Sequence, residues 1–257
     1  MSAHDLAARL RAAGCVFAED EAALLLDEAA DPDSLEAMVA RRVAGEPLET
    51  ILGWVEFDGL RIAVAPGVFV PRRRSEVLVH EVVRRAPAGA LVVELCCGVA
   101  AAAAALAHRR PDVEVLAADV DEAALACARG NLGPDRVFAG DLFTALPVDV
   151  RGRIDVLVAN APYVPTAEIA LMPPEARDHE PLVALDGGAD GLDVHRRIAA
   201  GLTTWLAPAG VVVIEASVAQ APTLAAILQA GGCVETEVRH DEDLDGTVVA
   251  GWLGPTN

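Results

Sequence analysis

Residues 90–107 read ALVVELCCGVAAAAAALA, and this stretch decides which fold the chain can adopt. Its first six residues are apolar except for Glu94, which is typical of a strand buried on both faces. A turn containing Gly98 follows, and then an alanine-rich segment. The stretch is almost long enough to cross a membrane, but Glu94 interrupts it and alanine is only weakly hydrophobic. We therefore interpret residues 90–95 as a buried strand that leads into a helix over residues 100–109.

The alternation of strand and helix continues toward the C-terminus. Repeated β-α units predict an α/β fold, with a mostly parallel sheet and helices on both faces. Seven strands are predicted, at residues 90–95, 113–118, 136–138, 154–159, 210–215, 233–239 and 247–252. Further helices are predicted at residues 121–131, 193–206 and 220–230.

The chain ahead of residue 75 has a different character. Residues 5–44 have helical periodicity that is broken at Asp31-Pro32. Residues 48–70 alternate as in a β-hairpin, and Asp58-Gly59 is a favoured turn sequence. We therefore expect three parts, which are a small helical domain at residues 1–44, a hairpin connector at 45–74 and the main domain at 75–257.

The charge of the chain limits its partners. It carries 20 basic and 39 acidic residues, a formal net charge of −19, and every basic residue is an arginine. Such a protein repels phosphate backbones and anionic lipid, so we expect no direct binding to nucleic acid and none to membranes. A local basic cluster, Arg72-Arg73-Arg74, either contacts an acidic partner or forms a solvated turn.

Cysteine usage and the N-terminal sequence favour a cytoplasmic location. The five cysteines have no metal-ligand spacing, so we expect neither a metal site nor a disulfide framework. The first residues, MSAHDLAARL, lack the apolar core of a signal peptide. We also expect a monomer, and we expect the isolated His179 and His195 to be surface or capping residues.

Polar side chains stand at the ends of four predicted strands. Glu94, Asp119, Asp141 and Asn160 follow one another at intervals of 25, 22 and 19 residues. Because ligands of parallel sheets bind beyond the carboxyl ends of the strands, we expect these groups to converge on one crevice. Asp119 is placed as a ribose-binding carboxylate would be, and Asp141 could accept from an exocyclic amine. The alternative for each acid is that it caps the following helix.

Residues 160–163, Asn-Ala-Pro-Tyr, directly follow a predicted strand and suggest a substrate with a planar NH2 group. The nitrogen of an amide is a poor nucleophile because its lone pair is delocalised. The side-chain oxygen of Asn160 and the main-chain carbonyl of Ala161 could accept its two hydrogens, while Tyr163 packs on its flat face. That is catalysis by positioning and electrostatics. The alternative is a proline-rich turn with a packing tyrosine.

Several short motifs follow in order along the chain. They are Gly45-Glu46-Pro47-Leu48, Leu52-Gly53, Glu56-Phe57, 66–72 with Glu76, 160–163, Glu180-Pro181, Ala184-Leu185, Gly187-Gly188 and 190–193. With these motifs the chain resembles, over about residues 40 to 252, the HemK/PrmC family of S-adenosylmethionine (SAM)-dependent methyltransferases. That family methylates the glutamine N5 in the Gly-Gly-Gln tripeptide of peptide chain release factors, and has Asn-Pro-Pro-Tyr where this chain has Asn-Ala-Pro-Tyr.

The resemblance implies a Rossmann-like class I methyltransferase that uses SAM, releases S-adenosyl-L-homocysteine and acts on a release factor. It implies that residues 1–44 recognise that partner. It further implies that the glutamine is held by Asn160, Ala161, Pro162 and Tyr163. The cofactor-binding residues that it implies are Glu94, Cys96, Gly98, Asp119, Val120, Asp141, Leu142 and Asn160.

The loop after the first strand departs from the family pattern. The family has Gly-x-Gly-x-Gly there, whereas this chain has Cys96, Gly98 and Ala100 at the three glycine positions. We expect the surrounding fold to have adjusted to the two side chains, and Cys96 and Cys97 to be packing residues. Two alternatives stay open. One is amino methylation of nucleic acid or a small molecule, and the other is a non-catalytic binding module derived from a methyltransferase.

Overall fold

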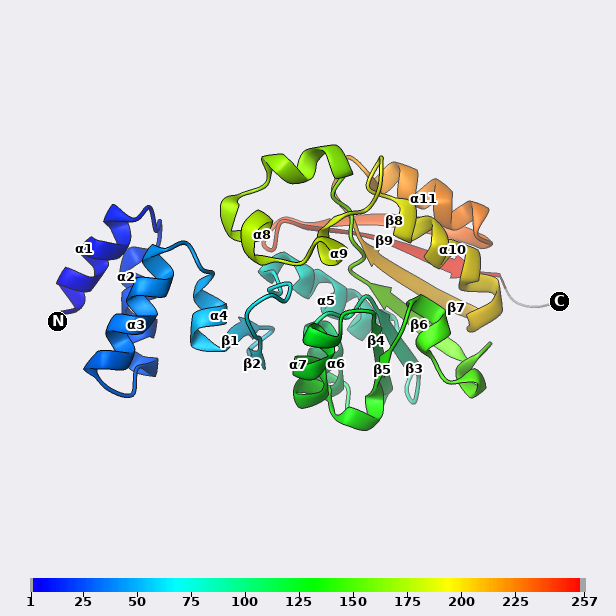
Figure 1. The fold of residues 1–257 in the computed structure, drawn as a ribbon. Coiled ribbons are helices and arrows are strands. Elements are labelled where there is room, and N and C mark those ends of the chain that lie inside the picture. The colour runs from blue at the N-terminus through cyan, green and yellow to red at the C-terminus, as the bar shows by residue number, and fades with distance from the viewer. Residues whose placement is uncertain (1, 255–257) are drawn as a thin grey trace.

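The computed structural model describes residues 2–254, and its main body is a seven-stranded sheet (Figure 1). The strand order is β5-β4-β3-β6-β7-β9-β8, in which β3 to β7 are parallel and β9 and β8 are antiparallel to their neighbours. This confirms the predicted mostly parallel α/β fold. The strands are β3 (Leu91–Leu95), β4 (Glu114–Asp119), β5 (Val137–Ala139), β6 (Ile154–Ala159), β7 (Leu206–Glu215), β8 (Cys233–Asp241) and β9 (Gly246–Leu253).

Helices cover both faces of this sheet because successive residues of its central strands point to opposite sides. On β3, Val92 packs in the core with one set of helices and Val93 in the core with the other. The first set is α5 (Glu76–Arg85), α6 (Ala101–Arg109) and α7 (Glu122–Leu132). The second set is α10 (Asp193–Trp205) and α11 (Ala221–Ala230). Residues 90–107 therefore form a strand and a helix, and among residues 2–254 no helix has the length and apolar character needed to span a membrane.

Short helical elements complete the main body between these longer ones. They are η1 (Arg73–Ser75), η2 (Pro134–Arg136), η3 (Leu142–Ala145), η4 (Val148–Val150), η5 (Thr166–Leu171), α8 (Pro174–His179) and α9 (Leu182–Leu185). The last three lie between β6 and α10. Most predicted elements end within two residues of the observed ones, but β7 begins at Leu206 rather than at residue 210.

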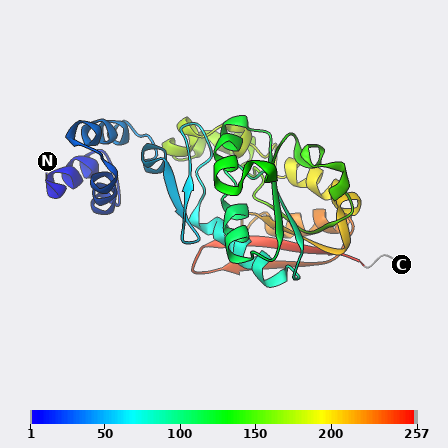
Figure 2. The ribbon, with the colours of Figure 1, turned by 90° about the horizontal axis from the view of Figure 1, so that it is seen from below.

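Three helices at the N-terminus lie to one side of the sheet in both views (Figures 1 and 2). They are α1 (Ala3–Ala12), α2 (Ala18–Glu28) and α3 (Pro32–Val43), and they share a separate apolar core. The predicted break at Asp31-Pro32 is present, since Asp31 caps α3 by accepting from the Ser34 amide at 2.7 Å. Buried Arg42 joins this part to the main body by pairing with Glu175 of α8 at 2.6 Å.

The connector contains a hairpin that is shorter than predicted. Strands β1 (Trp54–Phe57) and β2 (Leu60–Ala63) pair around Asp58 and Gly59, both with positive φ as a tight hairpin turn requires. Residues 48–52, however, form the helix α4 (Leu48–Leu52), so the prediction of a hairpin there is wrong. The reason is that Leu48, Ile51 and Leu52 recur at helical spacing and pack on the N-terminal core.

Candidate active site

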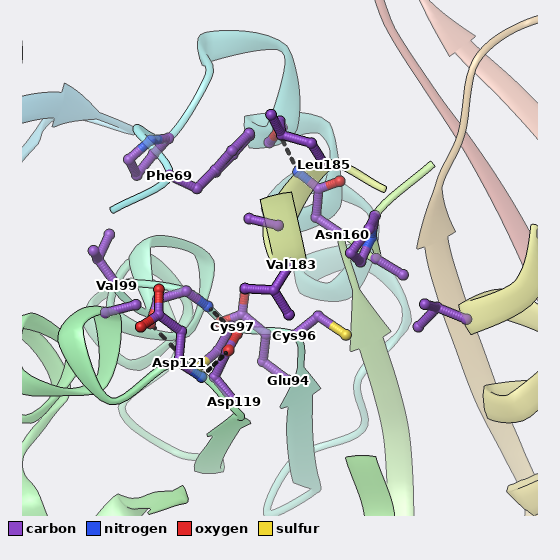
Figure 3. Close-up of a pocket in the computed structure, with 18 of the residues that line it drawn as sticks. Phe69, Glu94, Cys96, Cys97, Val99, Asp119, Asp121, Asn160, Val183 and Leu185 are labelled. Carbon is purple, nitrogen blue, oxygen red and sulfur yellow. Dashed lines mark hydrogen bonds between the residues drawn. The ribbon is translucent and has the colours of Figure 1, made fainter. Parts of the chain in front are cut away.

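A cavity of about 310 Å³ lies at the carboxyl ends of the parallel strands (Figure 3). Every site residue that was predicted from the sequence lines it. These residues are Glu94, Cys96, Gly98, Asp119, Val120, Asp141, Leu142, Asn160, Ala161, Pro162 and Tyr163. The convergence follows from the parallel sheet, in which each of these strand ends reaches the same edge.

Asp119 ties the loop after β3 to the loop after β4. One of its carboxylate oxygens accepts from the Gly98 amide at 2.7 Å, and the other from the Asp121 amide at 2.9 Å (Figure 3). Burial raises the pKa of Asp119, while these amide hydrogen bonds oppose the rise. The residue that caps α7 is Asp121, which accepts from the Ala123 amide at 2.9 Å. The capping alternative is therefore wrong for Asp119.

Glu94 does serve a helix terminus, as the capping alternative proposed. Its carboxyl group is buried and accepts from the Ala103 amide in the first turn of α6 at 2.8 Å. Burial raises the pKa of Glu94 to about 8. Burial therefore favours the protonated form of this carboxyl group, while the oxygen that faces α6 accepts from the helix.

Asp141 differs from the other two acids because it is half-exposed and paired. Its carboxylate forms an ion pair with Arg197 of α10, another residue that lines the cavity. Asp141 makes no capping bond to the short helix η3 that follows it. Asp141 and Arg197 together give the cavity one acidic and one basic group at its β5 side.

The loop after β3 has alternate residues in the left-handed region of backbone conformation. The φ angles are 54° at Cys96, 53° at Gly98 and 61° at Ala100. This conformation favours glycine, because an L side chain there clashes with the backbone. Cys96 and Ala100 are therefore strained in this loop. Ala100 also lies before α6 as its N-cap, so its predicted place inside the helix is wrong.

Neither cysteine of this loop has the character of a nucleophile. Burial raises the pKa of the Cys96 thiol and that of the Cys97 thiol, with nearby acids adding to the effect. Both thiols stay protonated at neutral pH, which supports the prediction that they pack rather than react.

Replacing Ala100 by glycine is expected to raise the free energy of unfolding by about 1 kcal/mol, because the left-handed strain at this position is relieved. Urea unfolding measures the change. Ala105→Gly, at a buried position inside α6, is the matched control and is expected to lower stability by about 1 kcal/mol. If both variants changed the free energy of unfolding in the same direction, backbone strain at Ala100 would be refuted.

SAM affinity is expected to stay unchanged in Ala100→Gly and in the double variant with Cys96→Gly.

The Asn160 side chain has one fixed end and one free end. Its Nδ2 donates to the Ser75 hydroxyl at 3.1 Å, as the dashed line at Asn160 in Figure 3 shows. Within residues 2–254 no hydrogen bond reaches its Oδ1. Asn160 therefore has an unpaired acceptor in the cavity wall, which is the group that the amide-holding hypothesis requires.

Glycines after the tetrapeptide allow its backbone to pack closely. A Cβ at Gly187 would lie 2.6 Å from the carbonyl oxygen of Pro162, and one at Gly191 would overlap the carbonyl oxygen of Tyr163. The side chain of Gln220 donates to that same Tyr163 oxygen at 2.9 Å. The glycine motif of residues 187–191 therefore holds the tetrapeptide in place.

Two residues of the arginine cluster before α5 pair with buried acids instead of forming a solvated turn. Arg72 pairs with the buried Glu180, whose Oε1 also accepts from the Val70 amide at 3.2 Å. Arg74 donates to the Tyr163 hydroxyl at 2.8 Å and to Glu215 at 3.3 Å. The interpretation as a solvated turn is therefore wrong for Arg72 and Arg74, whereas contact with an acidic partner stays a prediction. Arg73 is exposed.

The prediction that His195 is a surface or capping residue is also wrong. His195 is fully buried on the stripe of α10 that includes Ile198, Ala199 and Leu202, at helical spacing. Burial lowers its pKa to about 4. His195 is therefore a neutral core residue, whereas His179 is half-exposed at the end of α8.

Several cavity residues were missed by the sequence reasoning. Phe57 and Phe69 come from the connector, Val183 and Leu185 come from α9, and Ser75 ends η1 directly before α5. Phe57, Phe69 and Leu185 lie inside motifs of the family resemblance, so those motifs were a signal for them. Val183 gave no chemical signal, because an apolar side chain is equally typical of a core.

A mostly parallel seven-stranded sheet in this strand order, with a cavity beyond its strand ends, matches the Rossmann-like class I methyltransferase fold. A family model for the methyltransferase small domain matches residues 59–172. A release factor glutamine methyltransferase of Geobacter sulfurreducens is 37% identical over 89% of this chain and 82% of its own length. The chain therefore belongs to the release factor glutamine methyltransferase family.

Two other similar proteins extend this result. A 4-amino-L-phenylalanine/4-methylamino-L-phenylalanine methyltransferase of Streptomyces pristinaespiralis is 35% identical over 76% of this chain and 69% of its own length. A solved methyltransferase structure from Pyrococcus furiosus has a TM-score of 0.57 at 17% identity, covering 76% of this chain and 90% of that one. The latter likeness shows the fold.

Proposed function

We propose that the protein transfers a methyl group from SAM to the N5 atom of a glutamine side chain in a peptide chain release factor. The observation that carries this proposal is the unpaired Oδ1 of Asn160 in the cavity wall, beside an otherwise largely apolar lining. An amide NH2 group that donates to this oxygen has its nitrogen held at a fixed place. The Ala161 carbonyl is proposed as the second acceptor and the Tyr163 ring as the wall against which the amide lies.

The residues at the strand ends fit SAM as the cofactor. Asp119 offers carboxylate oxygens where a ribose would be bound, and Gly98 allows the backbone to approach the ligand closely. We propose that Glu94, Cys96, Val120, Asp141 and Leu142 complete this site. When bound, SAM would supply an electrophilic methyl group on sulfur. Transfer forms the bond between N5 and the methyl carbon, breaks the bond between that carbon and sulfur, and leaves S-adenosyl-L-homocysteine, while the nitrogen loses one hydrogen as a proton to solvent. The chain itself contributes orientation of the acceptor nitrogen and exclusion of water by apolar walls.

An acceptor panel tests the substrate. Transfer from SAM with a labelled methyl group is measured to a release factor, to that factor with its Gly-Gly-Gln glutamine changed to glutamate, to 4-amino-L-phenylalanine and to duplex DNA. We expect label only in the unmodified release factor. Labelling of the aromatic amine but not of the release factor would overturn the proposal. It would favour a small-molecule amine, the substrate named for one of the similar proteins.

The N-terminal helices are proposed to recognise the protein substrate. Their core is separate, and buried Arg42 anchors them to α8, which adjoins the cavity-lining segment. Monomeric state and cytoplasmic location stay predictions.

Deleting residues 1–44 is expected to lower methyl transfer to a whole release factor by at least about tenfold, the effect of losing about 1.4 kcal/mol of binding. Transfer to a short Gly-Gly-Gln peptide serves as the control. The rate of that transfer and the affinity for SAM are both expected to stay within about twofold of the full-length protein, a change of less than 1 kcal/mol. Equal rates of the truncated and full-length proteins on the whole factor would exclude a recognition role.

A further inference from the structure

A chain of polar contacts behind the cavity joins Asn160 to a buried carboxylate. Asn160 Nδ2 donates to the Ser75 hydroxyl at 3.1 Å, and the two residues are 85 positions apart in the sequence. Ser75 is 6% exposed and lies beside Glu215, which is 2% exposed at the end of β7. Asn160 and Glu215 end the neighbouring strands β6 and β7, so the sheet itself brings this set together.

The direction of these hydrogen bonds follows from the chemistry of Glu215. An ionised carboxylate only accepts hydrogen bonds. Glu215 Oε2 is buried and, within residues 2–254, accepts no hydrogen bond. The Ser75 hydroxyl lies beside this carboxyl group and is therefore the donor that can turn its hydrogen toward it. Burial raises the pKa of Glu215, although hydrogen bonding by Ser75 and the charge of Arg74 oppose the rise. The Arg74 guanidinium donates to Glu215 Oε1 at 3.3 Å, and this pairing favours the ionised carboxylate. Ser75 then has only lone pairs to offer Asn160.

The role of Ser75 as an acceptor decides which way the Asn160 side-chain amide is oriented. An asparagine side chain fits its space equally well with its oxygen and nitrogen exchanged, so hydrogen-bond partners select the orientation. Because Ser75 accepts, it binds the Nδ2 end and leaves Oδ1 for the acceptor substrate. With the amide reversed, Nδ2 would face the NH2 group of the substrate, and two donors would oppose each other.

The same carboxylate also governs the second polar residue of the tetrapeptide. Arg74 donates from Nε to Glu215 Oε1 at 3.3 Å and from Nη2 to the Tyr163 hydroxyl at 2.8 Å. Arg74, which also lines the cavity, therefore fixes the ring of Tyr163 through its hydroxyl and neutralises the charge of Glu215. One buried acid thus supports both ends of residues 160–163.

We propose that Ser75 and Glu215 are positioning residues that hold the Asn160 amide with its oxygen toward the substrate. This inference rests on the proposed function. Neither residue touches the reacting atoms in this account, and both act through Asn160.

Ser75→Ala tests the proposal, with kinetics on a release factor and SAM affinity measured by calorimetry. We expect kcat to fall about tenfold, because a hydrogen-bond preference of about 1.4 kcal/mol for one amide orientation is lost. The Kd for SAM is expected to stay within about twofold, since less than 1 kcal/mol is involved. Ser75→Thr keeps the hydroxyl and is expected to restore turnover. Thr236→Ala, which removes a hydroxyl from β8 outside the cavity lining, is the matched control and should leave turnover unchanged.

A double-mutant cycle separates positioning from structural support. In the Asn160→Ala background, Ser75→Ala is expected to have no further effect on single-turnover transfer, because there is no amide left to orient. Glu215→Gln is a second variant that gives Ser75 a donor in place of a pure acceptor, and it is expected to lower kcat as Ser75→Ala does.

The outcomes distinguish this inference from the proposed function. Wild-type turnover in Ser75→Ala, or an equal loss with and without Asn160, would overturn the positioning role. If Ser75→Ala does not fold, the Ser75→Thr and Glu215→Gln variants test the positioning role instead. Loss of turnover in Ser75→Thr would then count against that role. Absence of methyl transfer to the release factor by the wild-type protein would instead overturn the proposed function.

Discussion

Replacing Asn160 by alanine is expected to lower the rate of methyl transfer by about 100-fold or more. The structure leaves Oδ1 of Asn160 as an unpaired acceptor in the cavity wall. Removing one oriented electrostatic contact at the reacting group typically costs on the order of 10² to 10³ in kcat. Single-turnover transfer to a release factor, followed with a labelled methyl group, measures the change.

Two controls show that this loss is specific to transfer. SAM affinity, measured by calorimetry, is expected to stay nearly unchanged because Asp119 and the loop around Gly98 are untouched. Thermal unfolding of the variant is expected to stay close to wild type, since Asn160 is only partly buried. Unchanged turnover would mean that residues 160–163 form a structural turn.

Replacing Asp119 by alanine is expected to weaken SAM binding by roughly 100-fold. Hydrogen bonds to charged groups contribute about 1.5 to 3 kcal/mol each, and 2.7 kcal/mol corresponds to that factor. The change also removes the acceptor that fixes the Gly98 amide at 2.7 Å, so the cofactor loop loses its anchor. Calorimetric titration with SAM measures the affinity directly.

Asp119→Asn and Asp31→Ala are the matched controls for this variant. Asparagine keeps an oxygen for the Gly98 amide but loses the charge, so an intermediate affinity is expected. Asp31→Ala removes a capping carboxylate from distant α3, which lowers stability without changing affinity. If Asp119→Ala binds SAM as the wild type does, the carboxylate serves only to hold its own loops together.

The part of the site that was predictable comes from the strands. Glu94, Asp119, Asp141 and Asn160 end parallel strands, and the geometry of such a sheet alone brings them to one edge. The glycine positions of the loop were also readable. The structure adds that Cys96 and Ala100 adopt the left-handed conformation that glycine would favour.

The part that was not predictable depends on contacts between distant residues. Ser75 reaches Asn160 across 85 positions, and Arg74 reaches Glu215 across 141. No local pattern records such pairs, so an arginine that holds a buried acid has the same appearance in the sequence as one in a solvated turn. Helix α4 was missed because five residues are too few to separate helical from alternating periodicity.

Fragment mass spectrometry of a release factor after incubation with the protein and SAM tests the account most directly, because it locates the added methyl group. The account predicts one additional methyl group on the side-chain nitrogen of the Gly-Gly-Gln glutamine, and none when the Asn160→Ala variant is used. A methyl group on any other residue, or an unmodified release factor alongside a methylated small-molecule amine, would contradict it.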